Sequence, residues 1–90
     1  MIQRLCVIGV GLIGGSLALA LRRAGAVAEI VGAGRDEAHL RRAVELGIID
    51  RYDENLARAV RGSDMIVLAV PLGAIRSVCA AIRDQLDADA

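Results

Sequence analysis

The stretch that most constrains the fold is a short apolar run that ends in closely spaced glycines. It reads Val7-Ile8-Gly9-Val10-Gly11-Leu12-Ile13-Gly14-Gly15-Ser16, and Gly9, Gly11 and Gly14 have the spacing G-x-G-x-x-G. Between a strand and a helix, the first glycine permits a tight turn, the second leaves room for a pyrophosphate and the third allows close helix–strand packing. The helix N-terminus then favours an anion. Because this spacing alone is weak evidence, its interpretation depends on the rest of the chain.

Strand-like and helix-like patterns alternate along the whole chain. Apolar runs predict strands over 3–8, 28–33, 48–49 and 65–70, and helical patterns predict helices over 13–24, 36–46, 54–61 and 73–86. This alternation predicts a parallel sheet with helices on its faces. Right-handed crossovers place the strands in the order 3-2-1-4, with the glycine turn at the central switch point. The expected fold class is α/β, a partial Rossmann-type doubly wound parallel sheet of three αβα layers.

Burial can also be predicted segment by segment. The first helix is apolar nearly all round, which predicts that it is largely buried. The run 65–70 is the clearest buried strand, and 50–53 is expected to be a polar connection. The last helix is expected to bury one face, made of Ile75, Val78, Cys79, Ile82 and Leu86. Cys6 and Cys79 both lie in apolar segments, so both are expected to be buried, reduced thiols of a cytoplasmic protein.

Membrane and nucleic-acid functions are disfavoured. Leu5 to Leu21 contains only Ser16 as a polar residue and precedes Arg22-Arg23, as a signal or membrane segment would. However, a membrane span needs about 20 residues, and glycines weaken a single helix. The eleven arginines balance eleven acidic residues, which disfavours a nucleic-acid partner. The strand–helix alternation of the later segments counts most strongly against a membrane or targeting segment.

The end of the second predicted strand should determine which dinucleotide binds. NAD-binding proteins place an acid there, about 20 residues after the glycines, for the ribose 2′-hydroxyl. Gly34 occupies that position, and Arg35 follows with a side chain suited to a 2′-phosphate. Arg41 or Arg42 could reach the same region. This pattern favours NADP over NAD, although Asp36 keeps NAD open and could instead cap the next helix.

Two further segments bear on the site. Ala69-Val70-Pro71 follows the last strand beside the glycine turn, where strand ends line a ligand crevice, although Pro71 could simply terminate the strand. His39 lies among charged residues and is expected to be a solvated helix side chain. Neither a catalytic constellation nor metal-ligand spacing is visible, so we assign no catalytic residue and no metal ligand.

Four segments in combination are more specific than the glycines alone. They are the stretch 7–16, Ile30-Val31-Gly32, the run Ala43-Val44-Glu45-Leu46-Gly47-Ile48-Ile49-Asp50-Arg51, and Val67-Leu68-Ala69-Val70-Pro71. Over about residues 5 to 75 the chain resembles the prephenate/arogenate dehydrogenases of tyrosine biosynthesis. The resemblance implies a cytoplasmic oxidoreductase that couples hydride transfer from prephenate or arogenate to NAD or NADP with decarboxylation.

The resemblance also implies site residues and a larger protein. It implies pyrophosphate contacts from Gly9, Gly11, Leu12, Ile13 and Gly14, with Ser16 nearby, and a cofactor lining from Ala69, Val70 and Pro71. Arg35 lies where the family decides between NAD and NADP, and its neighbours Gly34 and Asp36 are expected cofactor-binding residues from their position after the second predicted strand. Many family members have an acid where this chain has Gly34, which again favours NADP. The family's catalytic histidine and an assisting serine lie farther along, as does a helical domain that forms the dimer. Residues 1–90 are therefore expected to be the N-terminal part of an NAD(P)-binding domain, inactive alone, in a protein that is a homodimer at full length.

Two alternatives remain open. A different NAD(P)-dependent enzyme, such as a 3-hydroxyacid dehydrogenase or an imine reductase, could share this N-terminal sequence pattern. A dinucleotide-binding assembly module without catalysis could also carry it, because the predicted edge of the fourth strand is open to another chain.

Overall fold

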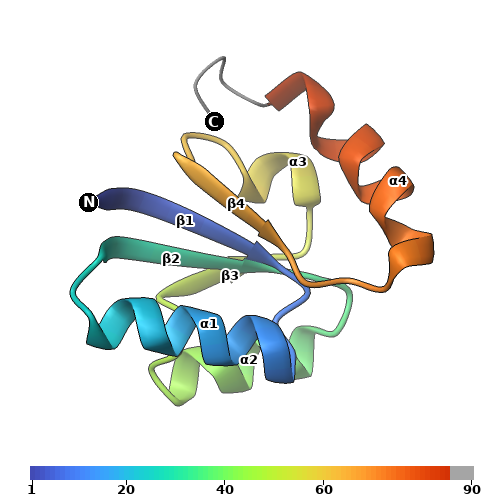
Figure 1. The fold of residues 1–90 in the computed structure, drawn as a ribbon. Coiled ribbons are helices and arrows are strands. Elements are labelled where there is room, and N and C mark those ends of the chain that lie inside the picture. Colours follow the sequence, from blue (N-terminus) through green and yellow to red (C-terminus); the bar gives the residue numbers. More distant parts are fainter. Residues whose placement is uncertain (86–90) are drawn as a thin grey trace.

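The computed structural model describes residues 1–85, which form a parallel sheet with helices on both faces (Figure 1). The elements are β1 (Ile2–Ile8), α1 (Leu12–Arg23), β2 (Val27–Ala33), α2 (Glu37–Glu45), β3 (Arg51–Asp53), α3 (Leu56–Ala59), β4 (Met65–Leu68), α4 (Leu72–Ile82) and a final 3-10 turn, η1 (Arg83–Gln85). The strand order is β3-β2-β1-β4. The predicted fold class and strand order are therefore confirmed.

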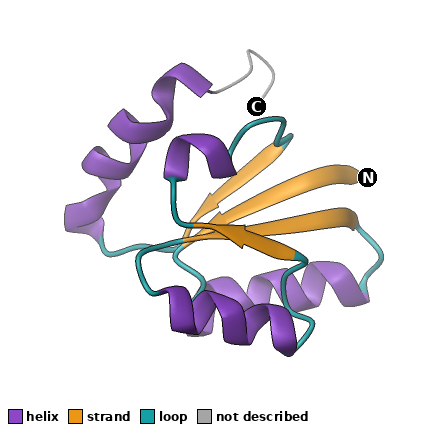
Figure 2. Cartoon of the chain, turned by 180° about the vertical axis from the view of Figure 1, so that it is seen from behind, coloured by secondary structure: helices purple, strands orange, loops and turns teal. Residues whose placement is uncertain are grey.

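The helices divide between the two faces of the sheet. α1 and α2 cover one face, whereas α3 and α4 cover the other (Figures 1 and 2). On β1, Leu5 and Val7 belong to the core cluster under α1 and α2, and Cys6 and Ile8 belong to the cluster under α3 and α4. All four side chains are buried. A central parallel strand covered on both faces needs such a continuous apolar run, which explains the sequence before the glycine turn.

The third strand lies later in the chain than the sequence predicts. The run 48–49 does not form it, and the predicted polar connection supplies β3, Arg51–Asp53. Ile49 is instead 2% exposed and packs in the core below the strand. The two roles differ because β3 is at the edge of the sheet, where polar side chains can face water. Ile49 anchors the segment before β3 in the core, and the polar residues Arg51–Asp53 pair with β2.

β4 and α1 are less buried than predicted. β4 ends at Leu68 rather than at residue 70, and within the described residues it pairs with β1 alone. Met65, at its start, is 42% exposed because the strand is at an edge. On α1, Ile13 is 79% exposed and only one face of the helix packs on the sheet.

Within residues 1–85, none of the helices has the length and the apolar character that a membrane-spanning helix requires.

The two cysteines differ, contrary to the prediction that both are buried. Cys6 is fully buried in β1, and burial raises the pKa of its thiol to about 12 despite the opposing positive charge of Arg51. Cys79 is exposed on α4, since Val78 and Ile82 are the residues that this helix buries. Leu86, the last residue of the predicted buried face, lies outside the described residues.

Asp50 joins the start of β3 to the centre of the fold. Its backbone N–H donates to the carbonyl of Ile30 (2.9 Å), and its carboxylate accepts from the Ile30 N–H (2.7 Å). The same carboxylate lies 3.0 Å from the guanidinium of Arg22 at the end of α1. Burial opposes the charge of Asp50, but these two donors outweigh it and lower the pKa of the carboxyl.

This lowered pKa predicts an acid-sensitive contribution to stability. The contribution is present above the unfolded value of about 3.9 and is lost as the pH falls through the lower folded value. We expect Asp50→Asn to cost about 0.5–1 kcal/mol at pH 7, a small effect because the pair is partly exposed and screened. Thermal melting of both proteins from pH 7 to pH 2 checks this. A gap between the two curves that stays constant down to pH 2 would contradict it.

Candidate functional site

Three loops meet at the carboxyl ends of the central strands. They follow β1, β2 and β4, and backbone hydrogen bonds connect them. The Gly9 N–H donates to the carbonyl of Ala33 at the end of β2 (2.8 Å), and the Ala69 N–H donates to the carbonyl of Ile8 at the end of β1 (2.8 Å). β1 lies between β2 and β4 in the sheet, and the three strands are parallel, so the loops that follow them lie side by side at the carboxyl ends of the strands. This is where ligands bind in open α/β sheets.

The glycine turn is closely packed at two of its glycines. Gly9 has φ +87°, and a Cβ there would lie 2.4 Å from the carbonyl oxygen of Ala69. A Cβ on Gly14 would lie 2.7 Å from the Gly9 carbonyl oxygen and 3.1 Å from Val7 Cγ1. The predicted roles of the first and third glycines, a tight turn and close helix–strand packing, therefore agree with the geometry.

Gly11, the second glycine, has open space in front of it. A Cβ there would meet no atom within 4 Å, and its carbonyl accepts the first helical bond from the Gly15 N–H (2.8 Å). Gly11 is the N-cap of α1, and because it has no side chain it makes no capping hydrogen bond to the first turn of the helix. The N-terminal turn of the helix therefore lies beside an opening into which an anion could approach the backbone.

A cavity of about 260 Å³ lies between the three loops. Most of the predicted binding residues line it, and these are Gly9, Gly11, Gly34, Arg35, Asp36, Ala69, Val70 and Pro71. The structure adds Val10, His39 and Leu40 to the lining. The volume is slightly below the ~300–1,000 Å³ of typical ligand pockets, so the cavity suits part of a dinucleotide rather than the whole molecule.

Three other predicted residues, Ile13, Gly14 and Ser16, are not among the described residues that line this cavity. Leu12 is the first residue of α1, and Gly14 lies within the first turn, packed on the sheet. Ile13 and Ser16 are both exposed on α1. Contact between these residues and a cofactor stays a prediction, and it would be made through the backbone at the helix N-terminus.

The segment after β2 places charge at the edge of the cavity. Asp36 is the N-cap of α2, and its carboxylate accepts from the His39 N–H (3.0 Å), which confirms the capping role predicted as one alternative. Gly34 brings no carboxylate to the cavity. Arg35 is exposed and lines the cavity. The cavity therefore has one arginine at its edge and one carboxylate that already accepts a hydrogen bond.

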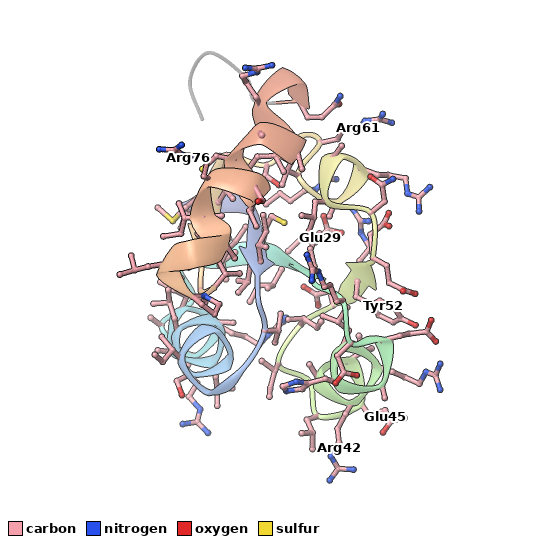
Figure 3. All side chains as sticks on the ribbon, turned by 90° about the vertical axis from the view of Figure 1, so that its right-hand side faces the viewer. Glu29, Arg42, Glu45, Tyr52, Arg61 and Arg76 are labelled. Atoms are coloured by element: carbon pink, nitrogen blue, oxygen red, sulfur yellow. The ribbon has the colours of Figure 1, made fainter. Side chains whose placement is uncertain are left out.

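A second, smaller cavity of about 140 Å³ lies between the glycine turn and α2. Its lining includes His39 and Arg42 from α2 and Gly11 and Gly15 from the turn and α1. The guanidinium of Arg42 extends beyond α2, away from the sheet (Figure 3). Arg41 instead forms an ion pair with Glu37 on the same helix. Neither arginine lines the larger cavity, although the sequence allowed for either to reach this region.

His39 is the polar site residue that the sequence interpretation missed. It is exposed, as predicted, but it lines both cavities. No signal in the sequence identifies it, because its place depends on how α2 packs against the glycine turn. Val10 has two roles: its side chain packs toward Gly32, and the residue also lines the cavity.

Comparison with known proteins identifies the family. The family described as NADP oxidoreductase, coenzyme F420-dependent, matches residues 4–90 of this chain. The chain belongs to this family. The chain is also 40% identical over 70 residues to the prephenate dehydrogenase of Lactococcus lactis subsp. cremoris (strain MG1363). That match covers 78% of this chain and 19% of that protein.

Solved structures agree with this assignment to the oxidoreductase family. Prephenate dehydrogenase from A. aeolicus, in complex with hydroxyphenyl propionate and NAD+, has a TM-score of 0.93 and 32% identity, over 100% of this chain and 32% of that one. Synechocystis arogenate dehydrogenase has a TM-score of 0.88 and 30% identity, over 98% of this chain and 31% of that one. The predicted resemblance is thereby confirmed. The present chain spans about a fifth of the length of the L. lactis protein and about a third of the length of each of these two structures.

Proposed function

We propose that the chain is the N-terminal part of the dinucleotide-binding domain of a dehydrogenase that oxidises prephenate or arogenate, and that it binds NADP in preference to NAD. The observation that carries this proposal is the cavity at the three strand ends, where an open glycine turn faces the Gly34-Arg35-Asp36 segment. The similar A. aeolicus enzyme holds NAD+. In the whole protein we expect the homodimer and the cytoplasmic location that the family resemblance implies.

The preference for NADP follows from charge at the edge of the cavity. A ribose 2′-hydroxyl is bound by an acid after β2, whereas this chain has Gly34 and then Arg35. The Asp36 carboxylate already caps α2, which leaves it less available to a hydroxyl. Arginine presents a planar set of donors that suits a phosphate.

The direct test is to titrate the 90-residue chain with NAD and NADP by calorimetry. We expect both to bind, with NADP the tighter ligand. Equal affinities would contradict the NADP preference, and failure of both to bind would contradict dinucleotide binding. Production of reduced cofactor from prephenate by this chain alone would contradict the proposal that the catalytic residues lie elsewhere.

Replacing Arg35 tests whether this residue causes the preference for NADP over NAD. We expect Arg35→Gln to weaken NADP binding about tenfold, or about 1.4 kcal/mol, because a charge-assisted contact to the 2′-phosphate is lost. NAD affinity should change less than about twofold, since NAD has no such group. Arg23→Gln is the matched control, because Arg23 is exposed in the last turn of α1, far from the cavity. Equal losses for NAD and NADP in Arg35→Gln would show that Arg35 does not discriminate between them.

A further inference from the structure

His39 has an unusual position between the two cavities. The residues that line both are Val10, Gly11 and His39. Val10 is apolar and Gly11 has no side chain, so His39 is the polar one of these three described residues. A dinucleotide in the larger cavity would therefore lie beside His39.

The position of His39 is fixed by its helix. Its backbone N–H donates to the Asp36 carboxylate, which holds the first turn of α2 in place. The next residue, Leu40, is 2% exposed and anchors the helix on the core. His39, Arg42, Ala43 and Leu46 are spaced as one helical face, and this face lines the smaller cavity against the glycine turn. The contacts that orient the helix therefore also place His39 on the face that lines both cavities.

The charges around His39 favour an anion. The larger cavity adds Arg35 and Asp36 from the loop after β2, whereas Arg42 lines only the smaller cavity and its guanidinium extends away from the sheet. The residues contributed by the glycine turn and by the loop after β4 carry no charged side chain. The Asp36 carboxylate accepts the backbone N–H of His39 through one oxygen. A carboxylate cannot donate to an anion, so among the described lining residues the side chains that can donate in the larger cavity are those of Arg35 and His39.

We propose that His39 is a second specificity-determining residue, which donates an imidazole N–H to the 2′-phosphate of NADP next to Arg35. This inference rests on the proposed function, since it requires a dinucleotide in the larger cavity. An imidazole carries at least one N–H in either protonation state, so the contact does not depend on the charge of the ring. A phosphate has acceptor oxygens for both side chains at once.

The test measures the affinity of His39→Ala for four ligands: NADP, NAD, 2′,5′-ADP and 5′-AMP. We expect NADP and 2′,5′-ADP to bind about fivefold more weakly than to the wild type, as expected for the loss of one ordinary hydrogen bond. NAD and 5′-AMP should change less than about twofold. His39 is exposed, so the variant should fold, and circular dichroism melting checks this.

A gain-of-function pair separates a local contact from a general effect of charge. His39→Lys should tighten NADP binding by about twofold or more, because an ammonium donates and attracts the phosphate. Ala38→Lys is its matched control: it adds the same charge on the same helix, at an exposed residue that lines neither cavity. At physiological salt, exposed charges are screened beyond about 8 Å, so the control should change NADP affinity less.

Different failures have different meanings. If the wild type binds neither NAD nor NADP, the proposed function fails and this inference fails with it. If the wild type binds both and His39→Ala leaves NADP affinity unchanged, or weakens NAD equally, only the role of His39 is overturned. Equal gains from His39→Lys and Ala38→Lys would likewise overturn the local contact.

Discussion

Gly9→Ala should destabilise the protein by about 3 kcal/mol, the largest effect expected for a single methyl group in this chain. The backbone of Gly9 has φ +87°, which costs energy for any residue with a Cβ. The added Cβ would also lie 2.4 Å from the carbonyl oxygen of Ala69, a backbone atom that cannot rotate away. Relief requires the loops after β1 and β4 to separate, which breaks the alignment of the cavity walls.

Thermal melting provides the measurement, with a loss of roughly 15 °C expected for a domain of this size. Gly73→Ala is the matched control. Gly73 lies in α4, where an added Cβ would meet no atom within 4 Å, so alanine there should be neutral or stabilise by up to about 1 kcal/mol. Similar melting temperatures for Gly9→Ala and the wild type would show that the turn has room that the geometry excludes.

Gly11→Val should separate ligand binding from folding. Gly11 has φ −119° and ψ −151°, an extended conformation open to any residue, and the space in front of it is unoccupied by protein. The substitution should cost about 1 kcal/mol, because valine is a poorer N-cap than glycine, and so lower the melting temperature by only about 4–8 °C. The valine side chain fills the space in which a pyrophosphate approaches the backbone, so NAD and NADP should both bind at least about tenfold more weakly.

Calorimetric titration of Gly11→Val with both cofactors measures this loss. Arg23→Gln serves again as a control, here for changes remote from the cavity. Because both cofactors share the pyrophosphate, their affinities should fall together, unlike the selective loss expected for Arg35→Gln. Undiminished binding to Gly11→Val would mean that the pyrophosphate lies elsewhere.

The parts of the fold that the sequence predicts well are those set by local rules and chain connectivity. The strand order follows from alternating elements and right-handed crossovers, and the burial of β1 follows from its apolar run. The sequence misplaces β3, because Ile48-Ile49 is more apolar than Arg51–Asp53, yet the edge of the sheet accepts polar residues and the core requires Ile49. Cys79 shows the same limit, since its exposure depends on how α4 is rotated against the sheet.

The candidate site divides in a similar way. The glycine turn and the segments after β2 and β4 could be predicted to meet, because parallel strands end at one edge of a sheet. His39 could not be assigned from its charged neighbours, since its role depends on the Asp36 cap and on the contact of α2 with the glycine turn. A residue between two cavities becomes visible only when tertiary packing defines both.

The hydrogen bonds that join the ends of β1, β2 and β4 are made entirely by main-chain atoms, from Gly9 to Ala33 and from Ala69 to Ile8. A frame of this kind does not depend on the side chains at its edge. Gly34, Arg35 and His39 can therefore be exchanged without moving the walls of the cavity. Cofactor preference in this fold is thus free to change during evolution while the architecture that holds the cofactor stays the same.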